Sequence, residues 1–488
     1  MKEIGLEEVK ILARDYNKIP ICLEMYMDFH TPIAVLSKMK EAYDRYFMLE
    51  SIEGGEKLAR YTFIGGNPKA QFFVKDGKSY YVTREKVSCS EENPFKVLGE
   101  ILKGYKAPKL EGMPPFTGGA VGYFGYEMVK YVERLELTNQ DVLKAADMKL
   151  MFFDEVIAFD HFKQKIILIF NIDIKEGNIE EAYTQGRERL QELAEFINKP
   201  TKRRTVQFEE ELSFESNTSK KAFMERVEIA KEYIRNGDIF QVVISQVFKA
   251  KLESNLFDVY RVLRTLNPSP YMYLMQFDDL QLAGASPETL VKVQEGVVTT
   301  MPIAGTRPRG KTAEEDARLD KELLEDAKEL AEHNMLVDLA RNDLGRISEF
   351  NSVKVVEYMA LKKFSHVTHI TSTVEGKLKN NLTSLDAIRS ILPAGTLSGA
   401  PKIRAMEIIE ELEEEKRGIY AGAIGYIGYD EQLDTCIAIR TVVKKDGYAY
   451  IQAGGGIVLD SVPELEYEES VNKATALLEA MKKVREII

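Results

Sequence analysis

Residues 301–312 constrain the fold more than any other stretch, because they contain a pattern that belongs to one kind of local architecture. The residues from Gly305 to Thr312 match G-x-x-x-x-G-K-S/T, the phosphate-binding loop of nucleotide hydrolases. Such a loop needs a buried strand before it, a helix packed on the sheet after it, and a later apolar strand that ends in a magnesium-binding Asp. The pattern therefore demands a strand, loop and helix in that order.

The residues that follow do not meet this demand. Residues 312–320 are too acidic to lie beside a polyphosphate and too polar to form a buried helix. Pro308 removes one of the backbone N–H donors that the loop would use. The candidate Asp338 lies within a helical pattern and not at the end of a strand. A nucleotide hydrolase therefore remains only as a disfavoured alternative.

The chain is long enough for two or three domains. Short apolar or alternating runs such as residues 71–74, 80–83 and 166–172 predict strands in the first 200 residues, and residues 180–197 have the spacing of an amphipathic helix. Residues 198–219 are rich in charge, Ser, Thr and Asn. We therefore expect an N-terminal domain over residues 1–205, a linker over 206–218 and a second domain over 219–488.

In the second domain, Ser219 is expected to cap a helix that runs to about residue 236. Strands are predicted over residues 239–248 and within 271–303, followed by one long charged helix over 313–343. A final helix is predicted over 463–487, with Pro463 in its first turn and Asp460 or Ser461 as its cap.

Two glycine-patterned segments, residues 118–127 and 421–430, resemble each other almost position for position. Glycine recurs about every three residues in an otherwise strand-like run, which predicts strands that bend or lie close to another backbone. Neither copy shows G-x-G-x-x-G opening a helix, so a dinucleotide fingerprint is excluded. We expect two related sheet elements, one in each domain.

Charge and cysteine usage exclude several classes of protein. The chain has 66 Lys and Arg against 78 Asp and Glu, a net charge of −12, and its basic residues are scattered, which argues against nucleic acid as a partner. Cys22, Cys89 and Cys436 lie far apart, as expected in a reducing cytoplasm without disulfides or zinc. No signal-peptide pattern or long apolar run is present, so we expect a soluble cytoplasmic protein without membrane contact.

Two pairs of carboxylates stand at i,i+3 spacing on predicted helices. Glu329 and Glu332 share one helix face, as do Glu466 and Glu469 in the final helix. Four hard oxygen donors on two helices suit Mg²⁺ and would leave room for water and a substrate carboxylate. Solvated helix faces remain the alternative, because acids are frequent in this chain.

Other polar features predict a site for an anion. His369 lies in a run bracketed by apolar residues and has the near-neutral pKa of a general acid or base, although a structural role is the alternative. His366 lies three positions earlier without a further N or S ligand nearby, so zinc is not expected. Glycine-rich turns at residues 395–402 and 452–457 would expose backbone N–H groups, and Arg440, on an apolar strand over 436–443, would add a planar cation.

Several long phrases of the sequence resemble the anthranilate synthase component I family of chorismate-using enzymes. They are Asp-Ile-Phe-Gln-Val-Val at 238–243, Gly-Ala-Ser-Pro-Glu at 284–288, Pro-Ile-Ala-Gly-Thr-Arg-Pro-Arg at 302–309, Glu-His-Asn-Met-Leu-Val-Asp-Leu-Ala-Arg-Asn-Asp at 332–343, Gly-Thr-Leu-Ser-Gly-Ala-Pro-Lys at 395–402 and Asp-Thr-Cys-Ile-Ala-Ile-Arg at 434–440. The resemblance implies an α+β fold of two associated domains with large antiparallel sheets and flanking helices.

The resemblance also implies roles for individual residues. Glu332 and Glu469 would ligate Mg²⁺, supported by Glu329 and Glu466. The groups that would bind chorismate are Gly305, Thr306, Tyr420, Arg440, Gly454, Gly455 and Gly456. His369, Thr396 and Glu288 would carry proton transfers while ammonia adds to the ring and pyruvate leaves, which yields anthranilate for tryptophan biosynthesis.

Two positions distinguish this family from its relatives. Aminodeoxychorismate synthases often carry Lys where this chain has Ala304, and isochorismate and salicylate synthases carry Lys where it has Gln241. The absence of both amines favours attack by external ammonia. The expected function is anthranilate synthesis, and an aminodeoxychorismate synthase component I is the alternative.

The resemblance further implies regulation and a partner. Glu50 and Ser51, with Pro268, Ser269, Pro270, Tyr271 and Met272, would form a tryptophan pocket for feedback inhibition. No cysteine lies in a glycine-flanked turn suited to glutamine hydrolysis. The ammonia would therefore come from a separate glutamine amidotransferase subunit, in a heterotetramer of two large and two small subunits.

Overall fold

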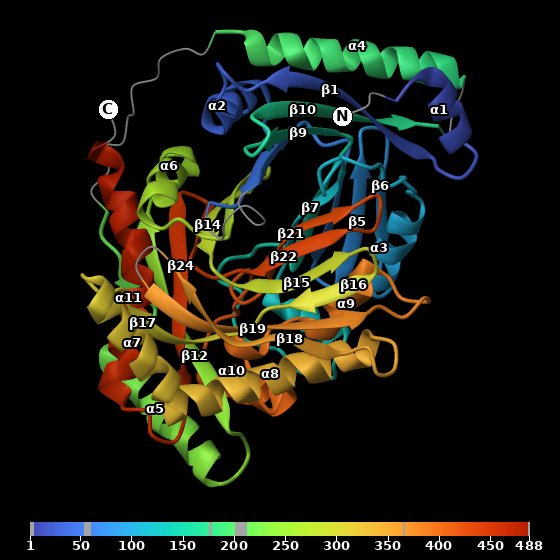
Figure 1. The fold of residues 1–488 in the computed structure, drawn as a ribbon. Coiled ribbons are helices and arrows are strands. Elements are labelled where there is room, and N and C mark those ends of the chain that lie inside the picture. Colours follow the sequence, from blue (N-terminus) through green and yellow to red (C-terminus); the bar gives the residue numbers. More distant parts are fainter. Residues whose placement is uncertain (1–3, 53–59, 175–177, 201–211, 365–366, 487–488) are drawn as a thin grey trace.

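The structure, a computed structural model, describes residues 4–52, 60–174, 178–200, 212–364 and 367–486. Two large antiparallel sheets lie face to face, and helices cover their outer faces (Figure 1). This arrangement confirms the predicted α+β class with large antiparallel sheets and flanking helices. In the described part of the chain, no helix is long and apolar enough to cross a membrane.

The first sheet has the order β1-β10-β9-β3-β2-β13-β14-β23-β24-β12-β11, and β20 also pairs with β12. Its strands, in chain order, are β1 (Lys18–Tyr26), β2 (Tyr46–Glu50), β3 (Tyr61–Gly66), β9 (Glu155–Asp160), β10 (Lys165–Asp173), β11 (Glu215–Ser216), β12 (Gln241–Lys251), β13 (Tyr271–Gln276), β14 (Leu280–Ser286), β20 (Gly399–Ala400), β23 (Thr441–Lys445) and β24 (Tyr448–Ile457).

The second sheet has the order β17-β19-β16-β15-β22-β21-β7-β8-β4-β5-β6, and β18 pairs with β19. Its strands are β4 (Ala70–Lys75), β5 (Lys78–Thr83), β6 (Val87–Ser90), β7 (Gly119–Phe124), β8 (Met148–Phe153), β15 (Thr289–Gln294), β16 (Val297–Thr300), β17 (Ile303–Pro308), β18 (Lys354–Lys363), β19 (Val367–Lys377), β21 (Ala423–Gly428) and β22 (Leu433–Ile437).

Each sheet takes strands from both halves of the sequence. In the first sheet β2 pairs with β13, and in the second β7 pairs with β21. The two glycine-patterned segments, which lie one in each predicted domain range, are therefore neighbours in one sheet. Their glycines allow this contact, since a β-carbon on Gly119 would lie 2.1 Å from the carbonyl oxygen of Ile427. The boundary at 206–218 stays a prediction, and residues 201–211 lie outside those described.

Four apolar clusters stabilise the described part of the molecule. One lies between the two sheets and includes Phe47, Phe116 and Tyr426. A second lies between the first sheet and its outer helices, and a third between the second sheet and its own. The fourth includes Phe223, Ile244 and Ile409. The helices are α1 (Leu6–Leu12), α2 (Pro32–Ala42), α3 (Pro94–Lys103), α4 (Ile179–Asn198), α5 (Lys220–Arg235), α6 (Leu256–Leu266), α7 (Ala313–Glu325), α8 (Ala327–Ile347), α9 (Ser384–Ile391), α10 (Lys402–Leu412) and α11 (Pro463–Lys482), with short 3₁₀ turns η1 (Tyr126–Tyr131), η2 (Gly395–Leu397) and η3 (Lys483–Glu486).

Most predicted helices are present, with two corrections. α4 and α5 match their predicted ranges, and Ser219 caps α5 by accepting from the Ala222 N–H. The predicted single helix over 313–343 is two helices, because Asp326 leaves the helical conformation and its side chain caps α8. α11 begins at Pro463 as expected, but neither Asp460 nor Ser461 caps it: Val462 occupies the cap position and the Ser461 hydroxyl accepts from the Val458 N–H.

Candidate active site

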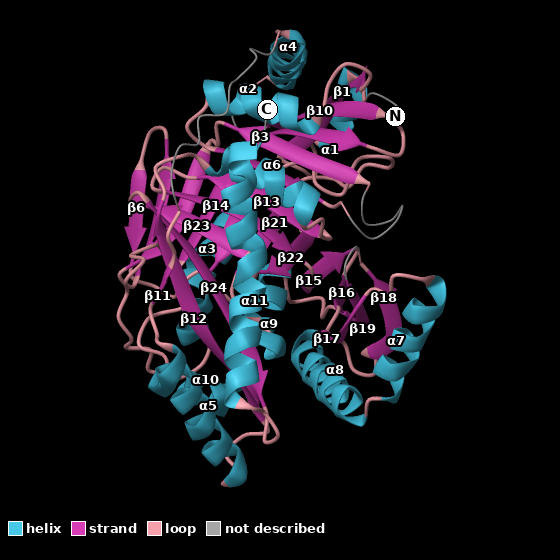
Figure 2. Cartoon of the chain, turned by 90° about the vertical axis from the view of Figure 1, so that its left-hand side faces the viewer, coloured by secondary structure: helices cyan, strands magenta, loops and turns pink. Residues whose placement is uncertain are grey.

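The predicted site residues come from both sheets, from two outer helices and from segments that connect these elements. β17 and β19 lie at one end of the second sheet, and β24 lies in the first sheet beside α11. α8 packs against β17 and β19 and α11 packs against β24, and Figure 2 shows the two helices at this region of the fold. The site is therefore assembled by tertiary structure from distant parts of the chain.

His369 lies on β19 directly opposite β17. Its Nδ1 atom lies 3.0 Å from the Thr306 hydroxyl and 3.0 Å from the Gly305 carbonyl oxygen. Burial lowers the pKa of His369, and the charges of Arg440 and Lys473 act in the same direction. The ring is therefore neutral at pH 7 and can accept a proton. His366, the other histidine of this run, lies outside the described residues.

Glu332 on α8 faces the first sheet. Its Oε1 atom accepts a 3.0 Å hydrogen bond from the Gln241 amide, and Gln241 in turn lies against Gly456, where a β-carbon would be 2.2 Å from Gln241 Nε2. Burial raises the pKa of Glu332, and the negative charges of Glu329 and Glu469 raise it further. The carboxylates of the two helices thus influence each other electrostatically.

The other three predicted metal ligands also have defined neighbours. Arg307 binds Glu329 at 3.2 Å, and Lys473 binds Glu469 at 2.7 Å. The pKa of Glu466 is raised by burial, and the charge of Glu469 contributes. Among the described residues, no three acidic, His or Cys side chains lie close enough to hold a metal ion. The donor chemistry fits Mg²⁺, and the carboxylates carry mutual repulsion that a divalent cation would relieve.

Lys473 was not identified from the sequence, although it stands four residues after Glu469 on α11. Its ammonium donates to the Gly454 carbonyl oxygen at 3.0 Å and pairs with Glu469. Its charge also lowers the pKa of His369 and counteracts the raised pKa of Glu288. The i,i+4 spacing of Glu469 and Lys473 was the available sequence signal, but that spacing is common on solvated helices.

Glu288 and Thr396 are joined by a hydrogen bond between their side chains. The Thr396 hydroxyl donates to Glu288 Oε1 at 3.0 Å. Glu288 is 7% exposed, and burial raises the pKa of its carboxyl to about 8, against the effects of the Thr396 hydrogen bond and the Lys473 charge. Both residues line a hollow of about 370 Å³, part of it open solvent. Glu288 is therefore protonated at neutral pH and can act as an acid.

The glycines of the site lie in two strands. Gly454, Gly455 and Gly456 lie inside β24, so the prediction of a turn at 452–457 was wrong. A β-carbon on Gly455 would lie 3.1 Å from Glu466 Oε2. Gly305 on β17 has φ of +66°, and a β-carbon there would lie 3.2 Å from Glu329 Oε2. Both glycines thus border a predicted metal ligand.

Arg440 does not lie on a strand, contrary to the prediction. It stands between β22 of the second sheet and β23 of the first, with φ of +49°. Burial lowers the pKa of its guanidinium. Within the described residues no carboxylate forms an ion pair with Arg440, which leaves its charge available to an anion.

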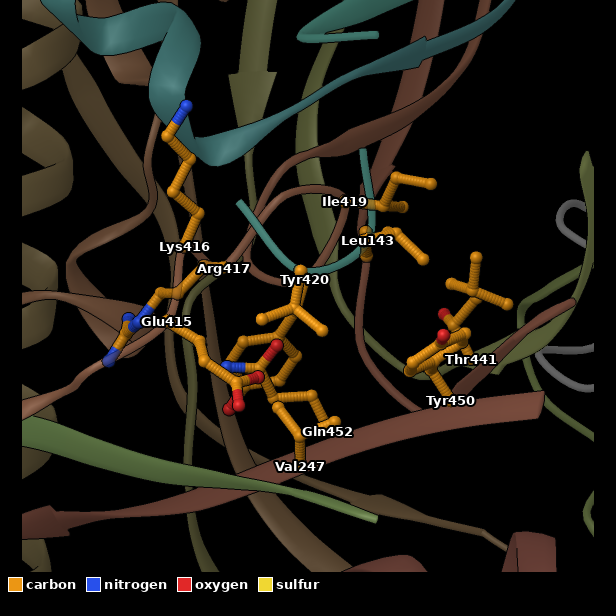
Figure 3. A pocket seen from close by; sticks show the side chains of 13 residues that line it. Leu143, Val247, Glu415, Lys416, Arg417, Ile419, Tyr420, Thr441, Tyr450 and Gln452 are labelled. Atoms are coloured by element: carbon orange, nitrogen blue, oxygen red, sulfur yellow. The ribbon is translucent and has the colours of Figure 1, made fainter. Parts of the chain in front are cut away.

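Tyr420 is buried in the segment between α10 and β21. It lines a hollow of about 510 Å³, part of it open solvent, together with Arg417 and Gln452 (Figure 3). The remaining lining residues include Thr441 and Ala438, which flank the segment of Arg440. Tyr420 therefore lines the same hollow as Thr441, which follows Arg440, and Gln452, which stands two residues before Gly454.

The residues of the predicted tryptophan pocket lie on adjacent strands. β2 pairs with β13 so that Glu50 is opposite Met272, and the Ile52 N–H donates to the Ser269 carbonyl oxygen at 3.2 Å. Both oxygens of Glu50 are bound by Arg264, and Tyr260 also donates to one of them. The tryptophan-binding role of Glu50, Ser51, Pro268, Ser269, Pro270, Tyr271 and Met272 stays a prediction.

Backbone N–H groups within the phosphate-loop pattern donate to acidic side chains of the same chain. β17 pairs antiparallel with β19, and after it the Gly310 N–H donates to Asp316 and the Lys311 N–H to Glu315, each at 2.8 Å. Arg309 also pairs with Asp316. These amides would be the phosphate donors of the loop, so the nucleotide hydrolase alternative is not supported.

Comparison with known proteins places the chain among enzymes that use chorismate. It is 49% identical to anthranilate synthase component 1 of Acetivibrio thermocellus, over 99% of both chains. It matches the crystal structure of anthranilate synthase component I from Streptococcus pneumoniae TIGR4 with a TM-score of 0.77 and 43% identity, covering 86% of this chain and 92% of that one. The menaquinone-specific isochorismate synthase of Escherichia coli shares the fold at a TM-score of 0.71 and 16% identity, with 98% of each chain covered.

The model of the family described as chorismate binding enzyme matches residues 44–479. This match and the full-length relatives show that the chain belongs to the chorismate-binding enzymes and, within them, to the anthranilate synthase component 1 enzymes.

Proposed function

We propose that the chain converts chorismate and ammonia to anthranilate, pyruvate and water, with Mg²⁺ as its cofactor. The observation that carries this proposal is that His369 bonded to Gly305 and Thr306, Glu288 bonded to Thr396, and the Glu332 carboxylate lie close enough to Arg440, Lys473 and Glu469 for their charges to interact. Among the described residues Arg440 has no ion pair. A base, an acid, an anion-binding cation and oxygen donors for a metal are the groups that amination and elimination on a dicarboxylate require.

In this proposal each residue has one task. Arg440 holds a substrate carboxylate through its planar guanidinium, and the backbone of Gly454 to Gly456 lets the ring approach β24 closely. His369 accepts a proton at Nε2, because its Nδ1 atom is engaged by Thr306 and Gly305. Glu288 holds the proton that the departing groups require, and Thr396 orients its carboxyl.

Glu332 and Glu469 would hold Mg²⁺, with Glu329 and Glu466 beside them. When bound, the ion supplies positive charge to the ring carboxylate of the substrate. Oxygens of Glu332, Glu329 and Glu469 also contact Gln241, Arg307 and Lys473, respectively.

The activity test uses the purified chain with chorismate, ammonium salt and Mg²⁺. We expect a fluorescent product with the mass of anthranilate. The alternative is an aminodeoxychorismate synthase, which differs at Ala304 on β17. Formation of 4-amino-4-deoxychorismate in place of anthranilate would refute the proposal.

The metal test uses Glu332→Gln and Glu469→Gln, with Glu468→Gln as the matched control. Glu468 is exposed, and its carboxylate lies 3.9 Å from the Lys220 ammonium. We expect both site variants to lose activity with ammonia and the control to keep it. Mg²⁺ should also raise the melting temperature of the parent chain and the control only. Full activity of both site variants at ordinary Mg²⁺ concentration would refute the metal assignment.

We further propose that a glutamine amidotransferase subunit supplies the ammonia, in a heterotetramer of two large and two small subunits. Burial raises the pKa of Cys22 to about 11 and also raises that of Cys436, so neither thiol is a thiolate at neutral pH. Cys89 is exposed on β6, at the end of the second sheet. Glutamine should support anthranilate formation only after the cognate amidotransferase is added, and turnover of glutamine by this chain alone would contradict the proposal.

Feedback inhibition by tryptophan completes the proposal. The neighbouring strands β2 and β13 bring the two predicted halves of the pocket together. The pocket residues and the predicted metal ligands lie on different elements. Tryptophan should therefore bind Glu332→Gln as tightly as the parent chain in a calorimetric titration. Loss of binding in that variant would show that the two sites are not separate.

A further inference from the structure

Arg417 is a buried cation in the segment that connects α10 to β21. Its side chain is 1% exposed and that of its partner Glu413 is 5% exposed. The pair is bidentate, with Nε at 2.8 Å from Oε2 and Nη2 at 2.7 Å from Oε1. This geometry fixes the plane of the guanidinium and leaves its remaining N–H groups pointing in defined directions.

The remaining N–H groups hold two elements of the candidate site. Nη1 donates to the Leu397 carbonyl oxygen at 2.6 Å, and Nη2 donates to the Val243 carbonyl oxygen at 2.7 Å. Leu397 ends the 3₁₀ turn that contains Thr396. Val243 lies two residues after Gln241, the partner of Glu332, on β12. One side chain thus connects the Thr396 turn with the strand of Gln241.

The guanidinium carbon lies over the ring of Tyr420, a predicted substrate-binding residue. Arg417 lies 5.7 Å from the centre of the Tyr420 ring and 5.0 Å from that of Tyr126. The hollow in Figure 3 is lined by both Arg417 and Tyr420. A cation at this distance from an aromatic face attracts the ring and restricts its orientation.

Glu413 extends the network to β24. It accepts from the N–H and the hydroxyl of Ser245, both at 2.8 Å, and the Ser245 hydroxyl accepts from Gln452 at 2.9 Å. Gln452 stands two residues before Gly454. The pair therefore contacts the segment of Thr396 and strand β12 directly, and reaches Gln452 on β24 through Ser245.

We propose that Arg417, held by Glu413, is a positioning residue that fixes Tyr420, Thr396 and Gln241 relative to one another for binding and conversion of chorismate. The inference rests on the proposed function. Stability alone does not require this arrangement, because replacing a buried ion pair by apolar groups of similar size is often neutral or stabilising. The planar guanidinium of Arg417 instead fixes the positions of the groups that it contacts. A misplacement of a reacting group by about 1 Å can reduce the reaction rate by roughly 100-fold.

The experiment compares the full chain with the double variant Arg417→Met/Glu413→Gln, which removes both charges and leaves no unpaired buried ion. The matched control is Arg226→Met/Glu414→Gln. Arg226 pairs with Glu414 at 2.8 Å, one residue from Glu413, but neither side chain contacts Tyr420, Thr396 or Gln241 among the described contacts. A second variant, Arg417→Lys, keeps the charge beside Glu413 without the planar fork.

KM and kcat for chorismate are measured with ammonium salt. The thermal unfolding curve gives the fraction of folded protein at the assay temperature. A loss of folded protein lowers the apparent kcat but leaves KM unchanged, so KM separates positioning from stability. We expect the double variant to raise KM by at least about tenfold and to lower kcat. Arg417→Lys should raise KM to a smaller extent. The KM and kcat of the control should stay within about twofold of those of the parent chain.

A folded double variant with the KM of the parent chain would overturn the inference, as would Arg417→Lys with unchanged KM and kcat. An equal rise in KM in the control would also overturn it. Absence of anthranilate formation in the parent chain is a different result, because it would refute the proposed function itself.

Discussion

The buried carboxyl of Glu288 predicts a specific dependence of stability on pH. Its pKa is raised from 4.5 to about 8, chiefly by burial. Between these two values the folded chain keeps the proton and the unfolded chain releases it. The free energy of unfolding therefore decreases as pH rises from about 4.5 to about 8, and this group has no further effect above that range.

The size of the effect follows from the same two values. One pKa unit corresponds to about 1.4 kcal/mol, so the raised pKa of Glu288 costs about 5 kcal/mol of stability above pH 8. Glu288→Gln keeps a group of the same shape that can still accept from Thr396 but cannot ionise. The variant should gain stability relative to the parent chain by about 1.4 kcal/mol for each pH unit between 5 and 8.

The assay is urea unfolding of both chains at a series of pH values from 5 to 9. Glu295→Gln is the control, because Glu295 is exposed on the turn between β15 and β16 and pairs only with Lys109 among the described residues. The control should follow the parent chain. If the stability curves of Glu288→Gln and the parent chain are parallel from pH 5 to pH 9, the carboxyl is not protonated in the folded chain and its role as an acid is wrong.

Three further predictions follow from the site. Lys311→Ala should leave anthranilate formation unchanged, because the Lys311 N–H is bound by Glu315 and the loop binds no phosphate; magnesium-dependent ATP turnover abolished by this variant would revive the nucleotide hydrolase. Gly455→Ala should lower kcat/KM at least about tenfold without lowering the melting temperature, because its β-carbon would press on Glu466 at 3.1 Å; unchanged kinetics would separate Gly455 from the site. Arg264→Met should lower the free energy of unfolding by roughly 3–5 kcal/mol in urea, because it leaves Glu50 buried without its cation, and a loss below about 1 kcal/mol would contradict this.

The local elements were largely predictable from the sequence, because hydrophobic spacing and caps act over a few residues. Residues 180–197 and 220–236 have helical spacing, and Ser219 supplies a hydroxyl cap. The break at Asp326 was missed because the charged pattern continues across it, and only the extended conformation of Asp326 separates the two helices. A side chain that can cap also occurs inside helices, so its presence alone does not mark a boundary.

The partners of the site residues were less predictable, because they are set by pairing between strands distant in sequence. The resemblance indicated Glu332 and His369, but not that Gln241 would bind the first or that Gly305 would engage the second. The spacing of Glu469 and Lys473 was visible, yet nothing local shows that Lys473 reaches the Gly454 carbonyl oxygen. Such contacts depend on how α11 packs on β24, which hydrophobic periodicity does not specify.

The apolar residues around Arg440 predicted one continuous strand, but Arg440 lies between two strands that belong to different sheets. β22 belongs to the second sheet and β23 to the first, so the chain must pass between sheets within residues 438–440. Arg440, the last residue before β23, has φ of +49°, so the chain is not extended at the end of this crossing. A non-glycine residue in this conformation costs of order 1 kcal/mol and is retained where the surrounding structure requires it. Here the residue is Arg440, a buried cation in the segment that connects the two sheets. The segment that joins the sheets therefore also carries the predicted carboxylate-binding group of the site.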